Sequence, residues 1–285
     1  MSTMTALVPT AVPPERWSAE DLEALRQAHR RLEHPSLAAR LSHVVGSPFD
    51  QAARLFPQSW QRRARRAAES VLLRMLDGVA GSMERMPPHP SHPVLHRLLV
   101  MGTGAAGGFF GPAAVLAELP LTTALMLRAI ADIAHAEGED MSTREARLAC
   151  VEVFALGGRS HEDDAADTGY YGLRLALALH LSQVGGYGAG AAVPGMLRFV
   201  QAVAARFGVV IADKAAAQAV PVAGAATGAA LNLLFLRHFQ DMARGHFVLR
   251  RLERSHGMEA VRREYERLER DEARNSKPFS HLEGW

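Results

Sequence analysis

A nearly uncharged stretch at residues 98–127, LLVMGTGAAGGFFGPAAVLAELPLTTALML, constrains the fold more than any other segment. Glu118 is its only ionisable side chain. A helix needs about 20 apolar residues to cross a bilayer, so length alone permits a membrane span. However, Gly and Ala fill much of residues 98–117, and a second apolar stretch at 221–236 is short before Arg237. We therefore interpret both stretches as core helices of a helical domain, with hairpin insertion or an integral span as alternatives.

The composition indicates an ordered chain with a substantial core. Of 285 residues, 48% are hydrophobic and 22% are charged, which is unlike a disordered protein. Because the net charge is only +2 and no recognised nucleic-acid-binding motif occurs, we expect no nucleic-acid partner. A single cysteine, Cys150, excludes an intramolecular disulfide and is expected to be a core thiol. No secretory signal pattern opens the chain, so we expect a cytoplasmic protein.

Apolar residues recur at spacings of three and four, and no segment alternates with a period of two. The pattern predicts an all-α fold, a multi-helix bundle with two Gly/Ala-rich apolar core helices. We expect a flexible N-terminal tail at 1–17, an N-terminal helical segment at 18–86, a proline-rich linker at 87–93 and a helical domain at 94–274. The predicted helices are 18–33, 36–45, 58–84, 94–102, 112–137, 142–156, 162–182, 194–207, 208–219, 221–256 and 257–274.

Small residues in the two apolar stretches predict close approach of helices. Gly224 and Gly228 are four apart, a spacing that lets two helix backbones touch. We assign the same packing role to Gly107, Gly108 and Gly111.

Two blocks resemble the EcsC family of bacterial proteins. In the first, a glycine-rich run is followed by Ala117, Glu118, Leu119 and Pro120, then by an Arg-x-Ile helix (Arg128, Ile130) ending in Gly138 and Asp140. The second places Pro221, Gly224, Ala225 and Asn232 in one apolar helix. The resemblance covers residues 58–256, and the acidic position before Leu-Pro, often Asp in the family, is Glu118 here.

The resemblance implies a helical protein whose biochemical role is mostly unknown. The family's namesake is encoded beside an ABC transporter, which suggests a membrane-protein partner. The family supplies no accepted catalytic residues, and no catalytic residue or cofactor is predicted here. His89, His92 and His96 are separated by prolines, and Asp163, Asp164 and Asp167 begin a predicted helix, so we expect no metal site.

Six polar residues lie in or beside the apolar segments: Glu118, Arg128, Asp132, Asp213, Lys214 and Asn232. A buried charge is costly unless it is paired, so one interpretation is an internal network in which Glu118 or Asp132 neutralises Arg128. The second is a polar floor that orients a lipid-like ligand in an apolar cavity. Catalysis is the third. His180, His238 and His246 are interpreted as structural.

A basic helix start gathers Trp60 with Arg62, Arg63, Arg65 and Arg66. Such a segment suits the phosphates of an anionic membrane surface, and the alternative is a solvated face of a core helix. The last helix carries Met258, Val261, Tyr265 and Leu268, which are expected to cover the protein's own core.

These patterns favour a lipid-binding or peripherally membrane-associated protein on the inner face of the cytoplasmic membrane. The alternatives are a hydrolase acting on a lipid or cell-envelope substrate, and an interaction module for a membrane transporter. The sequence specifies neither the ligand nor the oligomeric state.

Overall fold

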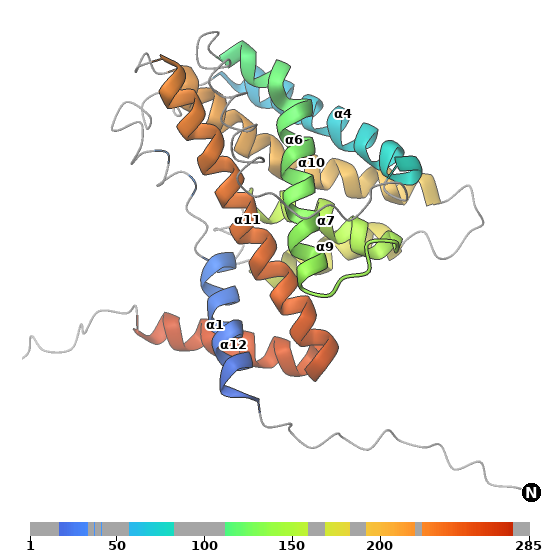
Figure 1. Ribbon diagram of the computed structural model, residues 1–285, viewed down its shortest axis with the longest axis vertical. Helices are drawn as coiled ribbons and strands as arrows, with labels where there is room; N and C mark the ends of the chain where they lie inside the picture. The colour runs from blue at the N-terminus through green and yellow to red at the C-terminus, as the bar shows by residue number, and fades with distance from the viewer. Residues whose placement is uncertain are drawn as a thin grey trace, which may run out of the picture.

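The computed structural model describes residues 17–33, 37, 41, 57–82, 112–158, 169–182, 192–219 and 224–275. All regular structure in these residues is helical, which confirms the all-α prediction. The helices are α1 Ala19–Glu33, α4 Gln58–Ser82, α6 Pro112–Ala136, α7 Arg144–Leu156, α9 Tyr170–Ser182, α10 Ala192–Ala219, α11 Gly224–His256 and α12 Met258–Asn275. In Figure 1, α4, α6 and α10 lie together beside the long helix α11, and α1 crosses α12 at the other end of the molecule.

Helix α10 lies at the centre and packs on α4, α6, α7 and α9. We expected two helices, at 194–207 and 208–219, but the helix is continuous through Gly208. A Cβ at Gly208 would lie 2.9 Å from the Cα of Arg65. Glycine is needed here for close approach to the α4 backbone, and it does not end the helix.

Helix α11 forms the second packing centre, in contact with α1, α6, α7 and α12. Buried side chains of α1, α4 and all the later helices belong to one hydrophobic core. The described parts of the predicted N-terminal segment therefore share a core with the helical domain, while the linker at 87–93 lies outside the described residues. Trp17, which we placed at the end of a flexible tail, stacks on His256 with ring centroids 4.4 Å apart.

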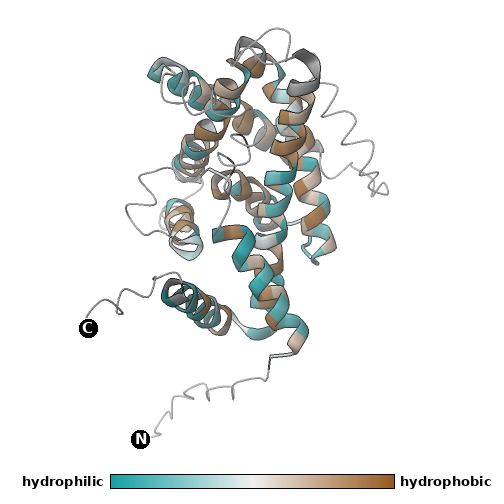
Figure 2. Ribbon diagram, turned by 90° about the vertical axis from the view of Figure 1, so that its left-hand side faces the viewer, coloured by the Kyte–Doolittle hydropathy of each residue, from teal (hydrophilic) through white to brown (hydrophobic). Residues whose placement is uncertain are grey.

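The helix starts and stops follow local chemistry. Ser18 accepts a hydrogen bond from the Asp21 amide at 2.9 Å and so caps the start of α1. Gly138 and Gly257 adopt φ of 83° and 85° after α6 and α11, a region that favours glycine. Val261 and Tyr265 of the predicted last helix are buried and Leu268 packs partly on the core, as expected, but Met258 is 58% exposed and does not cover the core. Figure 2 shows that the visible side of this helix, just before the C-terminal trace, is largely hydrophilic.

The predicted helix at 112–137 includes Pro120, and the structure confirms this helix. Pro120 lies inside α6, which continues to Ala136. Proline removes one backbone hydrogen bond and usually kinks a helix. The Thr122 hydroxyl donates to the Glu118 carbonyl at 2.6 Å, which gives that carbonyl a side-chain donor beside the proline.

Among the described residues, one helix is long and apolar enough to cross a membrane: Pro194–Ala219, with 56% of its apolar window buried. A single helix of this kind is weak evidence for a span, since core helices of soluble proteins pass the same test. The described parts of the two apolar stretches of the sequence lie in α6 and α11, which pack on each other. Residues 98–111 lie outside the described residues.

Candidate functional site

A buried ion pair joins α6 to α10. The Lys214 ammonium contacts the Glu118 carboxylate, and only 6% and 9% of their side-chain surfaces are exposed. The Lys214 Nζ also lies 5.6 Å from the centroid of the Phe235 ring on α11. Burial lowers the pKa of Lys214, and the Glu118 carboxylate opposes that shift. Because removing one partner would leave a buried charge unpaired, the two side chains act as a unit.

Buried polar atoms without hydrogen-bond partners accompany this pair. Glu118 Oε2 accepts no hydrogen bond in the described part of the chain. Gln218 lies one helical turn beyond Lys214, and its Oε1 and Nε2 atoms are buried without a partner there as well. Buried polar groups are nearly always hydrogen-bonded in native proteins, so these atoms are exceptions.

The other members of the predicted polar set are Asn232, Asp213 and the pair of Arg128 with Asp132. Asn232 is fully buried on α11, one turn before Phe235. Arg128 Nε donates to Asp132 Oδ1 at 3.1 Å, as their spacing predicted, but both side chains are about a quarter exposed. Asp213 is half-buried beside Lys214 in the chain. Lys214, and not Arg128, therefore neutralises Glu118.

The predicted membrane-contact residues lie at the start of α4. Arg62, Arg63, Arg65 and Arg66 are exposed, and Trp60 packs partly against the core. No described residue forms an ion pair with any of the four arginines, and the first turn of α4 contains no acidic residue. The helix dipole places further positive charge at this end.

Of the predicted packing glycines, Gly228 is buried in α11 and Gly224 begins that helix, while Gly107, Gly108 and Gly111 lie outside the described residues.

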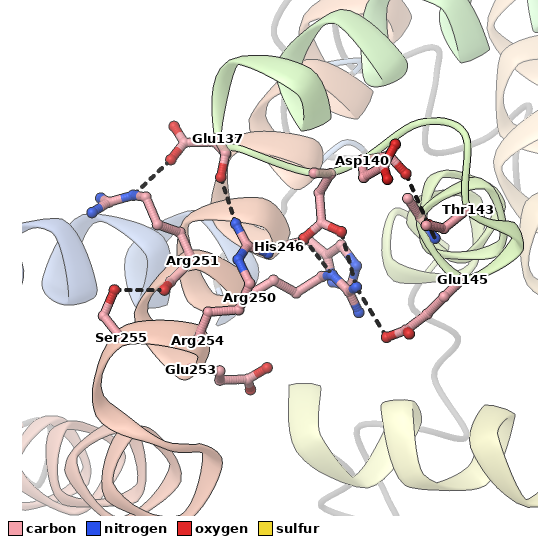
Figure 3. Close-up of polar contacts among 12 residues, drawn as sticks. Glu137, Asp140, Thr143, Glu145, His246, Arg250, Arg251, Glu253, Arg254 and Ser255 are labelled. Carbon is pink, nitrogen blue, oxygen red and sulfur yellow. Dashed lines mark hydrogen bonds and ion pairs between the residues drawn. The ribbon is translucent and has the colours of Figure 1, made fainter.

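A second polar cluster, which sequence reasoning missed, lies where the loop after α6 meets α11 (Figure 3). Arg250 Nε and Nη2 donate to the two Glu139 carboxylate oxygens at 2.9 and 3.0 Å, and Arg254 contacts the same carboxylate. Arg250 also reaches Glu145 at 3.3 Å. The two arginines hold the pKa of Glu139 below its usual value, against the effect of burial.

Buried tyrosines extend this cluster towards α1 and α12. The Tyr170 hydroxyl lies 2.9 Å from His246 Nδ1, and the Tyr265 hydroxyl donates to Glu33 at 2.6 Å. Burial, aided by nearby Arg174 and Arg250, lowers the pKa of His246 well below 6.5, so the ring is neutral. The structural interpretation of His246 agrees with these contacts.

Glu152 of α7 is a partly buried carboxyl group close in space to charged residues of α9 and α11. Arg174 donates to Glu253 Oε1 at 2.6 Å, and Tyr171 donates to the same oxygen at 3.1 Å, but no described residue hydrogen-bonds to the Glu152 carboxyl. Burial raises the pKa of Glu152 to about 7, with Arg174 and Arg250 opposing and Glu253 reinforcing that rise. Glu152 is the only charged residue in the apolar run LACVEVFAL, and this pattern could have identified it as a candidate buried acid from the sequence.

The predicted structural roles of three other side chains fit their surroundings. His238 Nε2 lies 2.9 Å from the Gly157 carbonyl, and burial raises the pKa of the Cys150 thiol to about 12. His180 is half-buried near the end of α9. No group of three metal-ligating side chains occurs in the ranges that the structure describes. His89, His92, His96, Asp163, Asp164 and Asp167 lie outside those ranges.

These features define an all-α protein whose core contains buried ion pairs between helices that lie far apart in the sequence. Residues 91–252 match the EcsC protein family, which is more than half of the chain. The protein belongs to this family, as its two sequence blocks indicated. No curated protein and no solved structure matches it.

Proposed function

We propose that this EcsC-family protein binds lipid at an anionic membrane surface as a peripheral protein of the cytoplasmic membrane, and does not act as an enzyme. The four exposed arginines of α4 carry the proposal: Arg62, Arg63, Arg65 and Arg66. Guanidinium groups form bidentate hydrogen bonds with phosphate, and each basic residue near an anionic bilayer contributes about 1 kcal/mol of binding.

The surroundings of these arginines support an external anionic partner. Many other arginines of the described chain are paired, such as Arg174 with Glu253 and Arg250 with Glu139. The α4 group concentrates positive charge beside the positive end of a helix dipole, an arrangement that an anion relieves. On the opposite face, Ala64, Ala68 and Leu72 anchor the helix in the core.

Vesicle co-sedimentation tests the proposal. Wild-type protein is mixed with vesicles of phosphatidylcholine alone or of phosphatidylcholine with phosphatidylglycerol, which is anionic. We expect binding only to the anionic vesicles, weakened by salt because screening shortens the range of the charges. Changing the four α4 arginines to Gln should weaken binding by roughly a hundredfold or more, on the per-residue contribution above.

A matched control removes the same charge elsewhere. Arg262, Arg263, Arg267 and Arg270 are exposed on α12, and changing them to Gln alters the net charge equally. This variant should keep most of the binding. Equal loss in the two variants would indicate a net-charge effect, and no binding by wild type would refute the proposal.

An interaction module for a membrane protein is the second candidate, favoured by the outer face of α9. Leu175 and Leu179 lie one turn apart there and are 59% and 53% exposed. A contiguous exposed apolar patch can mark a protein-interaction site, and these two leucines are the part of such a patch that α9 would supply. Changing both to Gln should leave vesicle binding intact if this face serves a protein partner.

The hydrolase alternative has less support. It relied on Glu118 or Asp132, and both carboxylates are held in ion pairs. A general base must be free to reach its proton.

A further inference from the structure

We propose that the outer face of the N-terminal half of α6 contacts the acyl chains of the same anionic bilayer whose phosphates the α4 arginines bind. The exposed residues of this face are Ala117, Pro120, Leu121 and Ala124, and we call it the α6 apolar face. The inference rests on the proposed membrane binding and adds the surface that reaches beneath the lipid headgroups.

The first argument is that this face carries no charge. Glu118 is the only ionisable side chain in residues 98–127, and it is buried in its ion pair with Lys214. The next charged side chains along α6 are Arg128 and Asp132, which pair with each other. The inward orientation of Glu118 therefore leaves the outer side of the first half of α6 uncharged.

The second argument is the exposure of apolar side chains on this face. Leu121 is 53% exposed, and the smaller residues of the face are exposed as well. Positions 117, 121 and 124 follow one another at spacings of four and three, so they form one stripe along the helix. A single exposed leucine is ordinary on a protein surface. An uncharged stripe around it, however, suits the boundary between headgroups and acyl chains.

The third argument is the position of this face relative to the α4 arginines. Helices α4 and α6 pack on each other and on α10 (Figure 1). Gly208 of α10 closely approaches Arg65 of α4, and Lys214 of α10 pairs with Glu118 of α6. Positions 208 and 214 lie about 9 Å apart along the helix axis, at 1.5 Å per residue. The phosphate-binding and apolar groups therefore lie beside the same half of α10, where one bilayer can meet both.

Fluorescence of a single labelled cysteine tests the inference on vesicles of phosphatidylcholine with phosphatidylglycerol. Leu121→Cys carries the environment-sensitive dye NBD, and Leu179→Cys on α9 is the matched control, because both leucines are 53% exposed. We expect a blue shift and quenching by acyl-chain spin labels at position 121, and neither at position 179. Unmodified wild type should take up little dye, since Cys150 is buried.

Vesicle binding gives a second readout. Leu121→Gln should weaken binding by about three- to tenfold, because a half-exposed leucine gains only part of the transfer free energy of a whole side chain. Leu179→Gln should leave binding unchanged. Both positions lie on the surface, and circular dichroism confirms that each variant is folded.

Three outcomes overturn the inference alone. The first is vesicle binding that depends on the α4 arginines while the emission at position 121 stays unchanged. The second is emission at position 121 that is already fully blue-shifted without vesicles. That result would show that a second copy, or another part of the chain such as residues 98–111, covers the face. The third is an equal shift at positions 121 and 179, which would indicate adsorption without a preferred face. If wild type binds no anionic vesicles, the proposed function fails and this inference fails with it.

Discussion

Arg250 holds Glu139 in a two-point contact, with Nε and Nη2 at 2.9 and 3.0 Å from the two carboxylate oxygens. Glu139 is buried and lies between Gly138, with its positive φ, and Asp140, which accepts hydrogen bonds from the Ser142 amide and hydroxyl. The family-like Gly-x-Asp spacing therefore shapes a turn that presents the intervening carboxylate to α11.

Arg250→Met should destabilise the protein by about 3 to 5 kcal/mol, because it leaves the Glu139 carboxylate buried with only Arg254 to pair with it. Urea unfolding followed by circular dichroism measures the loss. Arg262→Met removes an exposed pair with Glu266 and should cost less than about 1 kcal/mol. Equal losses in the two variants would contradict the role given to Glu139.

Glu152→Gln should change how stability depends on pH. The pKa of Glu152 is raised in the folded state from 4.5 to about 7. Between these values the unfolded chain releases the proton and the folded chain keeps it, so stability falls as pH rises through this window and levels off above it. The variant should therefore gain up to about 3 kcal/mol at pH 8 and little at pH 4.

The measurement for Glu152 is the difference in unfolding free energy between wild type and variant from pH 4 to 8. Taking the difference cancels the contribution of His246, which acts in the opposite direction as pH falls because its folded pKa is depressed. A difference that does not vary with pH would show that burial does not raise the pKa of Glu152 in the folded state.

Gly208→Ala should destabilise the protein by forcing α10 away from α4 at a point of close contact. The new Cβ would meet a backbone atom of Arg65 at 2.9 Å, and backbone cannot rotate away as a flexible side chain can. We expect a loss of about 1 to 3 kcal/mol, despite the better helix propensity of alanine. Gly172→Ala on the exposed face of α9 is the control, and thermal unfolding should show it unchanged or slightly stabilised.

Tyr170→Phe should cost about 1 to 3 kcal/mol, because it leaves His246 Nδ1 buried without its hydroxyl partner. His246→Leu alone should cost a similar amount. The double variant should cost less than the sum of the two, since each change removes the same contact. Additive losses in urea unfolding would show that the two side chains do not interact.

Some features followed from the sequence because local rules determine them. The spacing of apolar residues predicted the helices, and the four-residue spacing of Arg128 and Asp132 predicted that they can pair. Glu118 and Lys214 were selected as candidate buried residues because each is a charge within or beside an apolar segment. The ion-pair partner of Glu118 could not be predicted from the sequence, because only the packing of α6 on α10 brings Lys214 to it. Glu139, Arg174 and Glu253 were missed since charges on amphipathic helices ordinarily face solvent, and only tertiary packing buries them. The membrane role of the α4 arginines stays a prediction.

The hydrogen bond from Tyr265 to Glu33 joins residues 232 positions apart. Both lie outside the family-matched residues 91–252, on helices that cross at one end of the molecule (Figure 1). During synthesis, α1 emerges from the ribosome early and must wait until residue 265 has also emerged before this contact can form. Helix α1 therefore docks fully only late in translation, and its half-buried apolar face is a natural target for chaperones until then.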